Sequence, residues 1–228
     1  MIKFHPTDTD LVGFVEGSLV PAKSLLISAH LDLCDECAEK ATAFTENLAL
    51  QAIKPSSRKN YLDSSLVNMC ESIMELPAAT QHINADGFVK QTLSVDGRDF
   101  ILPEALSRFS NRIGEWSHLL GKLWQAPVEI GGGHLAQFIY MEKDGGVPEH
   151  THKGSELTLV IDGKFADGNE EYDSGDFISL DSTHTHTPVA VGDEGCLVFS
   201  IIDQPLYFTT GWARLINPLS HLYFRANS

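Results

Sequence analysis

The stretch His150-Thr-His152-Lys-Gly-Ser-Glu156 decides the fold of the second half of this chain. Its two histidines and its glutamate share parity, so on one extended strand their side chains would face the same side. Leu157 and Leu159 would take the opposite face, and Gly163 would end the strand. We therefore expect the imidazoles and the carboxylate to point into a small β-barrel.

Two further histidines, His184 and His186, follow later in the chain and share parity with each other. Either could reach the same ion from a neighbouring strand, and spacing alone does not choose between them. Three imidazoles and one carboxylate suit a site that holds zinc or iron. The alternative is a histidine-rich surface loop, which an isolated His-x-His would favour. Glu156 and Gly163 at their spacings make the metal site the better interpretation.

Strand-like segments surround this motif in the part of the chain that starts near residue 116. They cover residues 138–141, 156–162, 176–180 and 195–202. Turn signals such as Asp144-Gly-Gly146, Asp167-Gly168 and Ser174-Gly-Asp176 separate them. Many short strands with regular turns favour a β-sandwich or barrel.

The first part of the chain has helical periodicity instead. Thr7 offers an N-cap and Pro21 marks the start of a second helical run, which we expect to continue through residues 22–53. A further amphipathic helix is predicted over residues 62–76. Residues 77–100 look like a linker, although residues 93–95 could form a short strand.

A second metal motif, His30-Leu-Asp-Leu-Cys34-Asp-Glu-Cys37, lies in this helical part. On one continuous helix its three donors would fall within a stripe of about 60° and converge on one ion. His5, just before the first helix, is the obvious fourth ligand. Thiolates with imidazoles suit a closed structural zinc site.

Two other interpretations of the cysteine motif compete with zinc. Small cysteines are often plain core residues, with the histidine present by chance. A thioredoxin-like redox pair would place its Cys-x2-Cys at the start of a helix after a strand. Here Cys34 and Cys37 lie inside helical sequence, which favours the zinc interpretation.

Composition limits the possible partners and location. The 228 residues carry a formal charge of −15, and residues 1–80 hold 11 acidic against 6 basic side chains, a net −5. Such a surface repels phosphate backbones, so we expect basic protein partners and no direct contact with nucleic acid. The N-terminus lacks the apolar run of a secretion signal, and residues 19–29 are too short to cross a bilayer. The four cysteines, Cys34, Cys37, Cys70 and Cys196, form no disulfide framework. We expect a soluble cytoplasmic protein.

The second half resembles the cupin superfamily. His150-x-His152-x3-Glu156-x6-Gly163 matches the first cupin motif, and Ser174-Gly-Asp176 with His186 near Pro188 resembles the second. Cupins are small barrels with many functions, so this likeness implies a fold and leaves the function open.

The whole chain resembles the ChrR family of zinc-binding anti-sigma factors. The likeness rests on His30-Leu-x-Leu-Cys34-Asp-Glu-Cys37, Glu156-Leu-Thr-Leu-Val160 and His186-Thr-Pro-Val-Ala190. It implies a multidomain α + β protein with a small N-terminal helical zinc domain (residues 1–80), a linker (81–100) and a C-terminal cupin (101–228), a double-stranded β-helix or jelly-roll barrel. It also implies a regulator and not an enzyme. This regulator sequesters an extracytoplasmic-function sigma factor and releases it on oxidative stress, of the singlet oxygen or peroxide type, sensed through the cupin.

The resemblance also implies the ligand sets. His5, His30, Cys34 and Cys37 match the zinc ligands of the helical domain, and the cupin ligands are His150, His152, Glu156 and His186. The sequence after His186 selects it over His184. One departure concerns a cysteine pair of the family, because Cys196 is present but Val198 occupies the second place. A sensing scheme that needs two thiols is therefore in doubt, whereas one that works through the metal and its ligands survives.

These expectations leave open the contact surface and the alternatives. Leu62, Leu66, Met69 and Ile73 could form the sigma-binding face, or they could pack in an ordinary core. The barrel could contribute a homodimer contact. The competing function is a metal-dependent dioxygenase, with iron in the barrel and an accessory helical domain. A metal store is a weaker alternative, because it does not explain two dissimilar sites.

Overall fold

The computed structural model of the chain describes residues 1–53, 64–76, 91–119 and 121–227. The chain forms two compact units, Met1–Thr45 together with Lys90–Ser228, and Glu46–Val89. The expected boundary near residue 80 falls in residues 77–90, outside the described residues, so the domain limits given above stay a prediction.

Three helices begin the chain: α1 (Asp8–Glu16), α2 (Pro21–Leu31) and α3 (Asp35–Ala52). The Asp10 amide donates to the Thr7 hydroxyl at 3.2 Å and so caps α1, as predicted. Pro21 occupies the first turn of α2, where no amide proton is needed. Within the described part, no single helix is long and apolar enough to cross a membrane, and α1 with α2 passes that test of length and composition only as a pair bent by 110°.

The prediction of one helical run through residues 22–53 was wrong. A short turn separates α2 from α3, and the Cys34 amide donates to the His30 carbonyl at 2.9 Å just before α3 begins. Asp35 and Glu36 occupy the first turn of α3, where acidic side chains stabilise a new helix N-terminus. Apolar periodicity misses this break because apolar residues continue through it.

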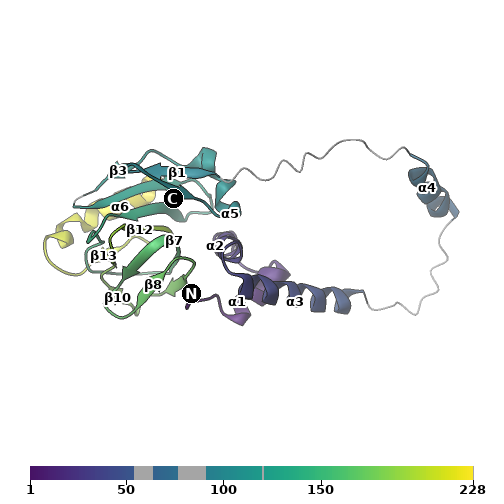
Figure 1. The fold of residues 1–228 in the computed structure, drawn as a ribbon, viewed down its shortest axis with the longest axis horizontal. Coiled ribbons are helices and arrows are strands. Elements are labelled where there is room, and N and C mark those ends of the chain that lie inside the picture. The colour runs from purple at the N-terminus through teal and green to yellow at the C-terminus, as the bar shows by residue number, and fades with distance from the viewer. Residues whose placement is uncertain (54–63, 77–90, 120, 228) are drawn as a thin grey trace. The chain divides into compact units, whose positions relative to one another are not determined.

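The rest of the first unit is a curled antiparallel β-structure (Figure 1). One sheet has the order β11-β7-β12-β5-β4-β3, with β8 and β9 also paired to β7, and a three-stranded sheet has the order β10-β6-β13. The strands are β3 (Ser117–His118), β4 (Leu123–Val128), β5 (Leu135–Met141), β6 (His150–Thr151), β7 (Glu156–Ala166), β8 (Glu171–Asp173), β9 (Phe177–Leu180), β10 (Thr185–His186), β11 (Val189–Ala190), β12 (Cys196–Ile202) and β13 (Tyr207–Phe208). This arrangement confirms the predicted jelly-roll fold class and the four predicted strand segments.

Shorter elements complete the first unit. A hairpin of β1 (Thr92–Val95) and β2 (Arg98–Ile101) confirms the short strand expected near residue 93. The other short elements are α5 (Glu104–Ser107), η1 (Ser110–Arg112), η2 (Trp212–Ile216) and α6 (Asn217–Asn227).

The two faces of the curled sheet are both buried, against different neighbours. Leu157 and Leu159 point outward and share one core with Leu26 and Ile27 of α2. The inward face carries Glu156 and the alternate residues after it, which confirms the predicted alternation in this strand. Every residue of β12 is buried, which explains why its sequence Cys-Leu-Val-Phe-Ser-Ile-Ile is apolar except for Ser200 and does not alternate.

Gly163 does not end its strand, contrary to the prediction, because β7 continues to Ala166. Its φ is +82°, and a Cβ at this position would lie 2.2 Å from the Gly195 carbonyl oxygen. β7 pairs with β12 as far as Gly163, and from Lys164 onward it pairs with β8. A glycine therefore lets the strand turn from one neighbour to the next at a point of close backbone contact.

The second unit contains α4 (Ser64–Met74), which confirms the predicted amphipathic helix over its described part. The expected start at Leu62 lies outside the described residues. All residues from 64 to 76 are exposed, including the large apolar ones.

Two candidate metal centres

The first centre lies where α2 and α3 meet. His5 comes from the segment before α1, His30 from the last turn of α2, Cys34 from the turn between the helices, and Cys37 from the first turn of α3. One ligand atom from each residue lies within 4.8 Å of the others. The His5 Nδ1 atom is 3.5 Å from the Cys34 sulfur and 3.3 Å from the Cys37 sulfur.

The structure corrects the reason for this convergence. The donors do not form a stripe on one helix, because the helix break lies between His30 and Cys37. Cys34-Asp-Glu-Cys37 in fact opens a helix, as a redox pair would, but the preceding element is α2 and not a strand. Two imidazoles beside the two thiols favour metal binding over dithiol chemistry.

Hydrogen bonding fixes the state of His30. Its Nδ1 donates to the Gly175 carbonyl at 2.8 Å, so its Nε2 carries the lone pair. This Nε2 is buried and has no hydrogen-bond partner among the described residues. Burial lowers the pKa of His30 to about 4, so the imidazole stays neutral and can act as a ligand.

The thiols complete a donor set that fits zinc. Burial, and next the neighbouring Cys34, raise the pKa of Cys37 to about 12. A thiolate in this position therefore needs a cation beside it. Two sulfurs and two imidazole nitrogens form the closed tetrahedral set typical of structural zinc.

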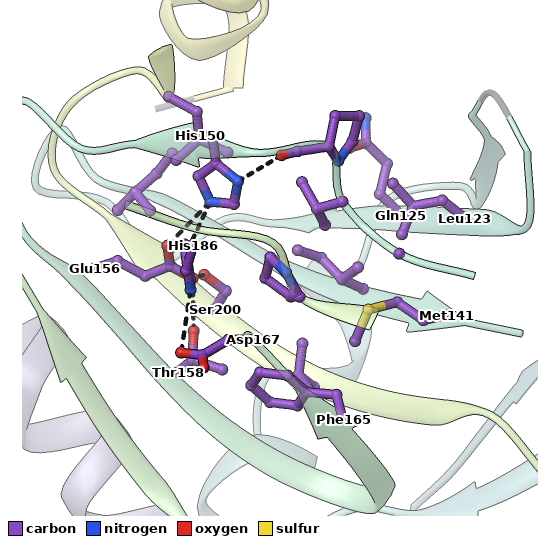
Figure 2. A pocket seen from close by; sticks show the side chains of 18 of the residues that line it. Leu123, Gln125, Met141, His150, Glu156, Thr158, Phe165, Asp167, His186 and Ser200 are labelled. Carbon is purple, nitrogen blue, oxygen red and sulfur yellow. Dashed lines mark hydrogen bonds and ion pairs between the residues drawn. The ribbon is translucent and has the colours of Figure 1, made fainter. Parts of the chain in front are cut away.

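The second centre lies inside the barrel (Figure 2). His150 on β6 pairs directly with His186 on β10, and their Nε2 atoms are 2.9 Å apart. The His152 Nε2 atom lies 3.2 Å from the His186 Nε2 atom and 3.3 Å from the Glu156 Oε2 atom. Nitrogens bound at 2.0–2.1 Å to a tetrahedral ion lie about 3.3 Å apart, so these separations leave room for one ion.

The structure also corrects how these donors meet. His150, His152 and Glu156 do not share one strand, because β6 ends at Thr151 and a short turn precedes β7. The turn returns the chain so that Glu156, at the start of β7, faces the two histidines. The shared parity of these three residues grouped them correctly, although they do not lie on one strand as that argument assumed.

Neighbouring groups orient the Glu156 carboxylate. The hydroxyls of Thr158 and Ser200 donate to its Oε1 at 2.8 and 3.1 Å. Its buried Oε2 has no hydrogen-bond partner in the described structure and faces the imidazoles. Burial opposes ionisation of Glu156, but the surrounding histidines, His150 first, outweigh it and lower its pKa to about 2.

Hydrogen bonds and burial act on the imidazoles around this carboxylate. His150 Nδ1 donates to the Pro148 carbonyl at 2.9 Å, which leaves the Nε2 lone pair facing the centre. Burial lowers the pKa of His186 to about 4 and also lowers the pKa of His152. Three imidazoles and one carboxylate, converging in a buried space, fit a divalent cation.

The structure chooses between the two later histidines. His186 is buried in the cluster, whereas His184 is exposed and its Nδ1 lies 2.9 Å from the Asp181 carboxylate. Sequence reasoning missed Asp167 and Tyr172 beside this centre. Asp167 was regarded only as part of a turn, although it is buried, and its carboxylate lies 3.7 Å from the His186 Nδ1 atom.

Comparisons with known proteins point to one family. Residues 111–204 match the model of the ChrR Cupin-like domain. The chain is 30% identical over 220 residues to the anti-sigma-E factor ChrR of Cereibacter sphaeroides, which covers 95% of this chain and 97% of that protein. The chain belongs to the ChrR family.

A structural comparison extends over both halves of this ChrR-family protein. The structure of this chain superposes with a TM-score of 0.65 on a chain in the crystal structure of Rhodobacter sphaeroides SigE in complex with the anti-sigma ChrR. The match has 26% sequence identity and covers 89% of this chain and all of the other.

The ChrR-type barrel encloses a chamber of about 390 Å³ next to its metal centre. Most of the lining is apolar, as shown around Leu123, Met141 and Phe165 in Figure 2. His150, Glu156 and His186 form part of the same wall. The metal centre is therefore reached from a space that can accept a small molecule.

Cys196 is a core residue of this ChrR-family barrel. It is buried opposite Met141 and Gly163, and burial strongly raises the pKa of its thiol. With Val198 in place of the second cysteine, its position favours packing over redox chemistry.

Proposed function

We propose that this protein is an anti-sigma factor that sequesters an extracytoplasmic-function sigma factor in the cytoplasm and releases it on oxidative stress sensed through the barrel. Its relative over nearly the full length is an anti-sigma-E factor, and the similar crystal structure holds SigE with ChrR. The matched ChrR covers 95% of this chain, and the match to the ChrR Cupin-like domain spans residues 111–204, which include the barrel centre.

The exposed apolar stripe of α4 is the observation that carries the partner-binding role. Leu66, Met69 and Ile73 are 45%, 51% and 56% exposed and lie on one face of the helix. A helix with such a stripe gains free energy when a groove of a partner covers it. This favours a contact surface over the core packing that the sequence left open.

Charge supports a protein partner. The chain carries a formal charge of −15, which disfavours nucleic acid and favours encounter with a basic protein surface. Dimerisation through the barrel stays a prediction.

Zinc at the first centre would control the shape of the helical part. Structural zinc contributes roughly 10–16 kcal/mol of apparent binding free energy in small peptides, against roughly 5–15 kcal/mol for the stability of a whole domain. His5, His30, Cys34 and Cys37 would hold the ion and thereby fix the N-terminal segment and α3 to α2. The second centre would hold zinc or iron, and an oxidant that alters the metal or its ligands would start release.

The direct test is capture of a sigma factor by the full-length protein from a lysate of the native host, with mass spectrometric identification. We expect one extracytoplasmic-function sigma factor with the wild type and none with a C34S/C37S double variant. If the folded, metal-loaded wild type recovers no sigma factor, the proposal is wrong.

The chamber also supports a second candidate function, that of a metal-dependent dioxygenase. An apolar cavity beside three histidines and a glutamate could also hold a substrate. Iron in the barrel, with oxygen consumed in the presence of small diketones or flavonols, would support this alternative. Absence of turnover by the iron-loaded protein would remove it.

A further inference from the structure

A short polar row crosses the mostly apolar lining of the barrel chamber. Ser200 on β12 pairs with Gln137 on β5 and with Thr158 on β7, which places a polar row beside the metal centre. Two residues further along, Val198 pairs with Ile139, and both line the chamber. An occupant that matches this lining has an apolar body and one polar group.

One acceptor in this polar row lacks a donor. Gln137 is 6% exposed and lines the chamber, and its Oε1 atom is buried with no hydrogen-bond partner in the described residues. The hydroxyls of Thr158 and Ser200 cannot serve it, because they already donate to Glu156. A buried carbonyl without a donor costs free energy that a ligand hydroxyl can restore.

We propose that the chamber binds a small apolar molecule that carries a hydroxyl group, such as an alkylphenol, with the hydroxyl donating to Gln137. The volume of about 390 Å³ suits one ring with a short alkyl substituent. A role of this ligand in triggering sigma release rests on the proposed function. Its binding to the chamber can be measured independently of that function.

The test is calorimetric titration of the full-length protein with 4-tert-butylphenol and with 4-tert-butylanisole, which lacks the donor. We expect the phenol to bind about tenfold tighter, Q137L to abolish this difference, and V198F, which narrows the chamber, to weaken the binding of both compounds. Equal affinities for the two compounds, no binding to the wild type, or binding unaffected by V198F would overturn the proposal. Sigma binding measured on the same samples separates a failure of the proposed function from a failure of the ligand site.

A different observation carries a second inference, about how the two centres communicate. The turn between β8 and β9 holds the backbone that leads to His5. The buried Asp176 carboxylate accepts hydrogen bonds from the Lys3 amide at 2.6 Å and the Phe4 amide at 3.0 Å. The Phe177 amide in turn donates to the Phe4 carbonyl at 2.9 Å.

The same turn holds His30. Its Nδ1 donates to the Gly175 carbonyl, and Phe177 packs edge-on against its ring with centroids 6.0 Å apart. Gly175 has a φ of +92°, and a Cβ there would lie 2.5 Å from the Cδ1 atom of Ile2. The contact therefore depends on a position that only glycine fits.

The elements that flank the turn lead to the barrel centre. Tyr172 on β8 packs against Phe4 with the rings tilted and their centroids 4.8 Å apart, and its hydroxyl donates to the Asp167 carboxylate at 3.1 Å. That carboxylate lies 3.7 Å from His186. On the other flank, Leu180 of β9 pairs with Glu156.

We infer that the β8–β9 turn transmits the state of the barrel centre to the helical centre, with Tyr172 as a positioning residue between His186 and the segment that carries His5. The turn touches the supports of both centres, so a displacement of His186 reaches Phe4 through Asp167 and Tyr172. Loss of support at Phe4 would then loosen His5 beside the two cysteine sulfurs.

The cysteines of the chain provide the measurement. Alkylation by iodoacetamide is followed at each cysteine by peptide mass spectrometry in the full-length protein, with Cys196 reporting barrel opening and the exposed Cys70 as reference. We expect the alkylation rate of Cys37 to be at least fivefold higher in H186A than in H184A, while Cys196 stays protected from alkylation. Adding Y172F to H186A should remove most of that increase. A Cys37 rate that is equal in H186A and H184A, that rises only together with Cys196, or that responds additively to H186A and Y172F would overturn the inference.

Discussion

His150 and His186 face each other across β6 and β10 with their Nε2 atoms 2.9 Å apart. His150 already donates its Nδ1 proton to Pro148, so its Nε2 presents a lone pair to the other ring. With His152 and Glu156, three imidazole nitrogens and one carboxylate oxygen meet at the same point. A divalent cation would contact all four donor atoms at once, whereas hydrogen bonds can join them only in pairs.

Removal of His186 is therefore expected to empty the barrel centre alone. We expect H186A to lose one of two metal equivalents, because three remaining donors leave a buried site incomplete. Elemental analysis of the purified protein measures this. H184A is the matched control, since His184 is exposed and bound to Asp181, and it should keep both equivalents. Two equivalents in H186A would contradict the assigned ligand set.

Removal of one thiol is expected to empty the helical centre. C34S and C37S should each lose one metal equivalent, lower the free energy of unfolding by several kcal/mol, and weaken sigma binding by at least about 100-fold. Metal analysis, denaturant unfolding and calorimetry with the captured sigma factor check these outcomes. C70S, which removes an exposed thiol, should retain both metals. Tight sigma binding by a C37S protein without this metal would show that the ion is incidental.

The stripe on α4 is expected to contribute to affinity and little to stability. M69Q and I73Q should each weaken sigma binding about tenfold, because each removes apolar area that the partner would bury. Both side chains are exposed, so the free energy of unfolding should change by less than about 0.5 kcal/mol. N68Q, at an exposed neighbouring position, is the control. Unchanged affinity in M69Q and I73Q would place the interface elsewhere.

Acid is expected to destabilise the metal-free protein over a defined range. Burial holds the pKa of His30 and His186 at about 4 in the fold, against 6.5 for an exposed histidine. Between these values the unfolded chain binds more protons, so the stability from both groups is complete above pH 6.5 and is lost as the pH falls towards 4. Each histidine contributes a slope of up to roughly 1.4 kcal/mol per pH unit. Denaturant unfolding of chelator-treated protein measures the slope, and H186A should reduce it by about half. A flat profile over this range would contradict it.

Close backbone contact at Gly163 is expected to make it intolerant of any side chain. G163A should lower the free energy of unfolding by at least about 2 kcal/mol, since its methyl group would meet the Gly195 carbonyl. G168A separates this contact from backbone strain, because Gly168 also has a positive φ but has open space around it. Equal losses in the two variants would mean that conformation alone accounts for the effect.

Local patterns predicted helices followed by a β-sandwich or barrel and grouped most of the donors, whereas the jelly-roll class and the choice of His186 over His184 came from the resemblance to the ChrR family. Alternation in β7 assigned Glu156 and Leu157 to opposite faces, and the structure has them so. The helix break before Asp35 and the turn before Glu156 escaped the same reasoning. Both depend on contacts across the fold, such as the bond from His30 to Gly175, which no local window contains.

The residues around the barrel centre show a similar limit. Asp167 and Gly168 formed a turn signal in the sequence, and the backbone does turn there, with Asp167 accepting from the Asn169 amide. Only the fold brings this carboxylate to Tyr172 and His186, 5 and 19 positions further along the chain. When a residue already has a role in a local turn, neither spacing nor parity reveals that it also contacts residues distant in the sequence.

The position of Cys37 in the first turn of α3 makes that helix a lever. The rod runs from Asp35 to Ala52, about 27 Å at 1.5 Å per residue, and few of its side chains are buried beyond the cysteine. A tilt of 10° at the metal cluster would move the far end by about 5 Å. A small tilt of the helix at the cysteine sulfurs, which unfolds nothing there, would thus displace the other end of the helix by about the width of a side chain.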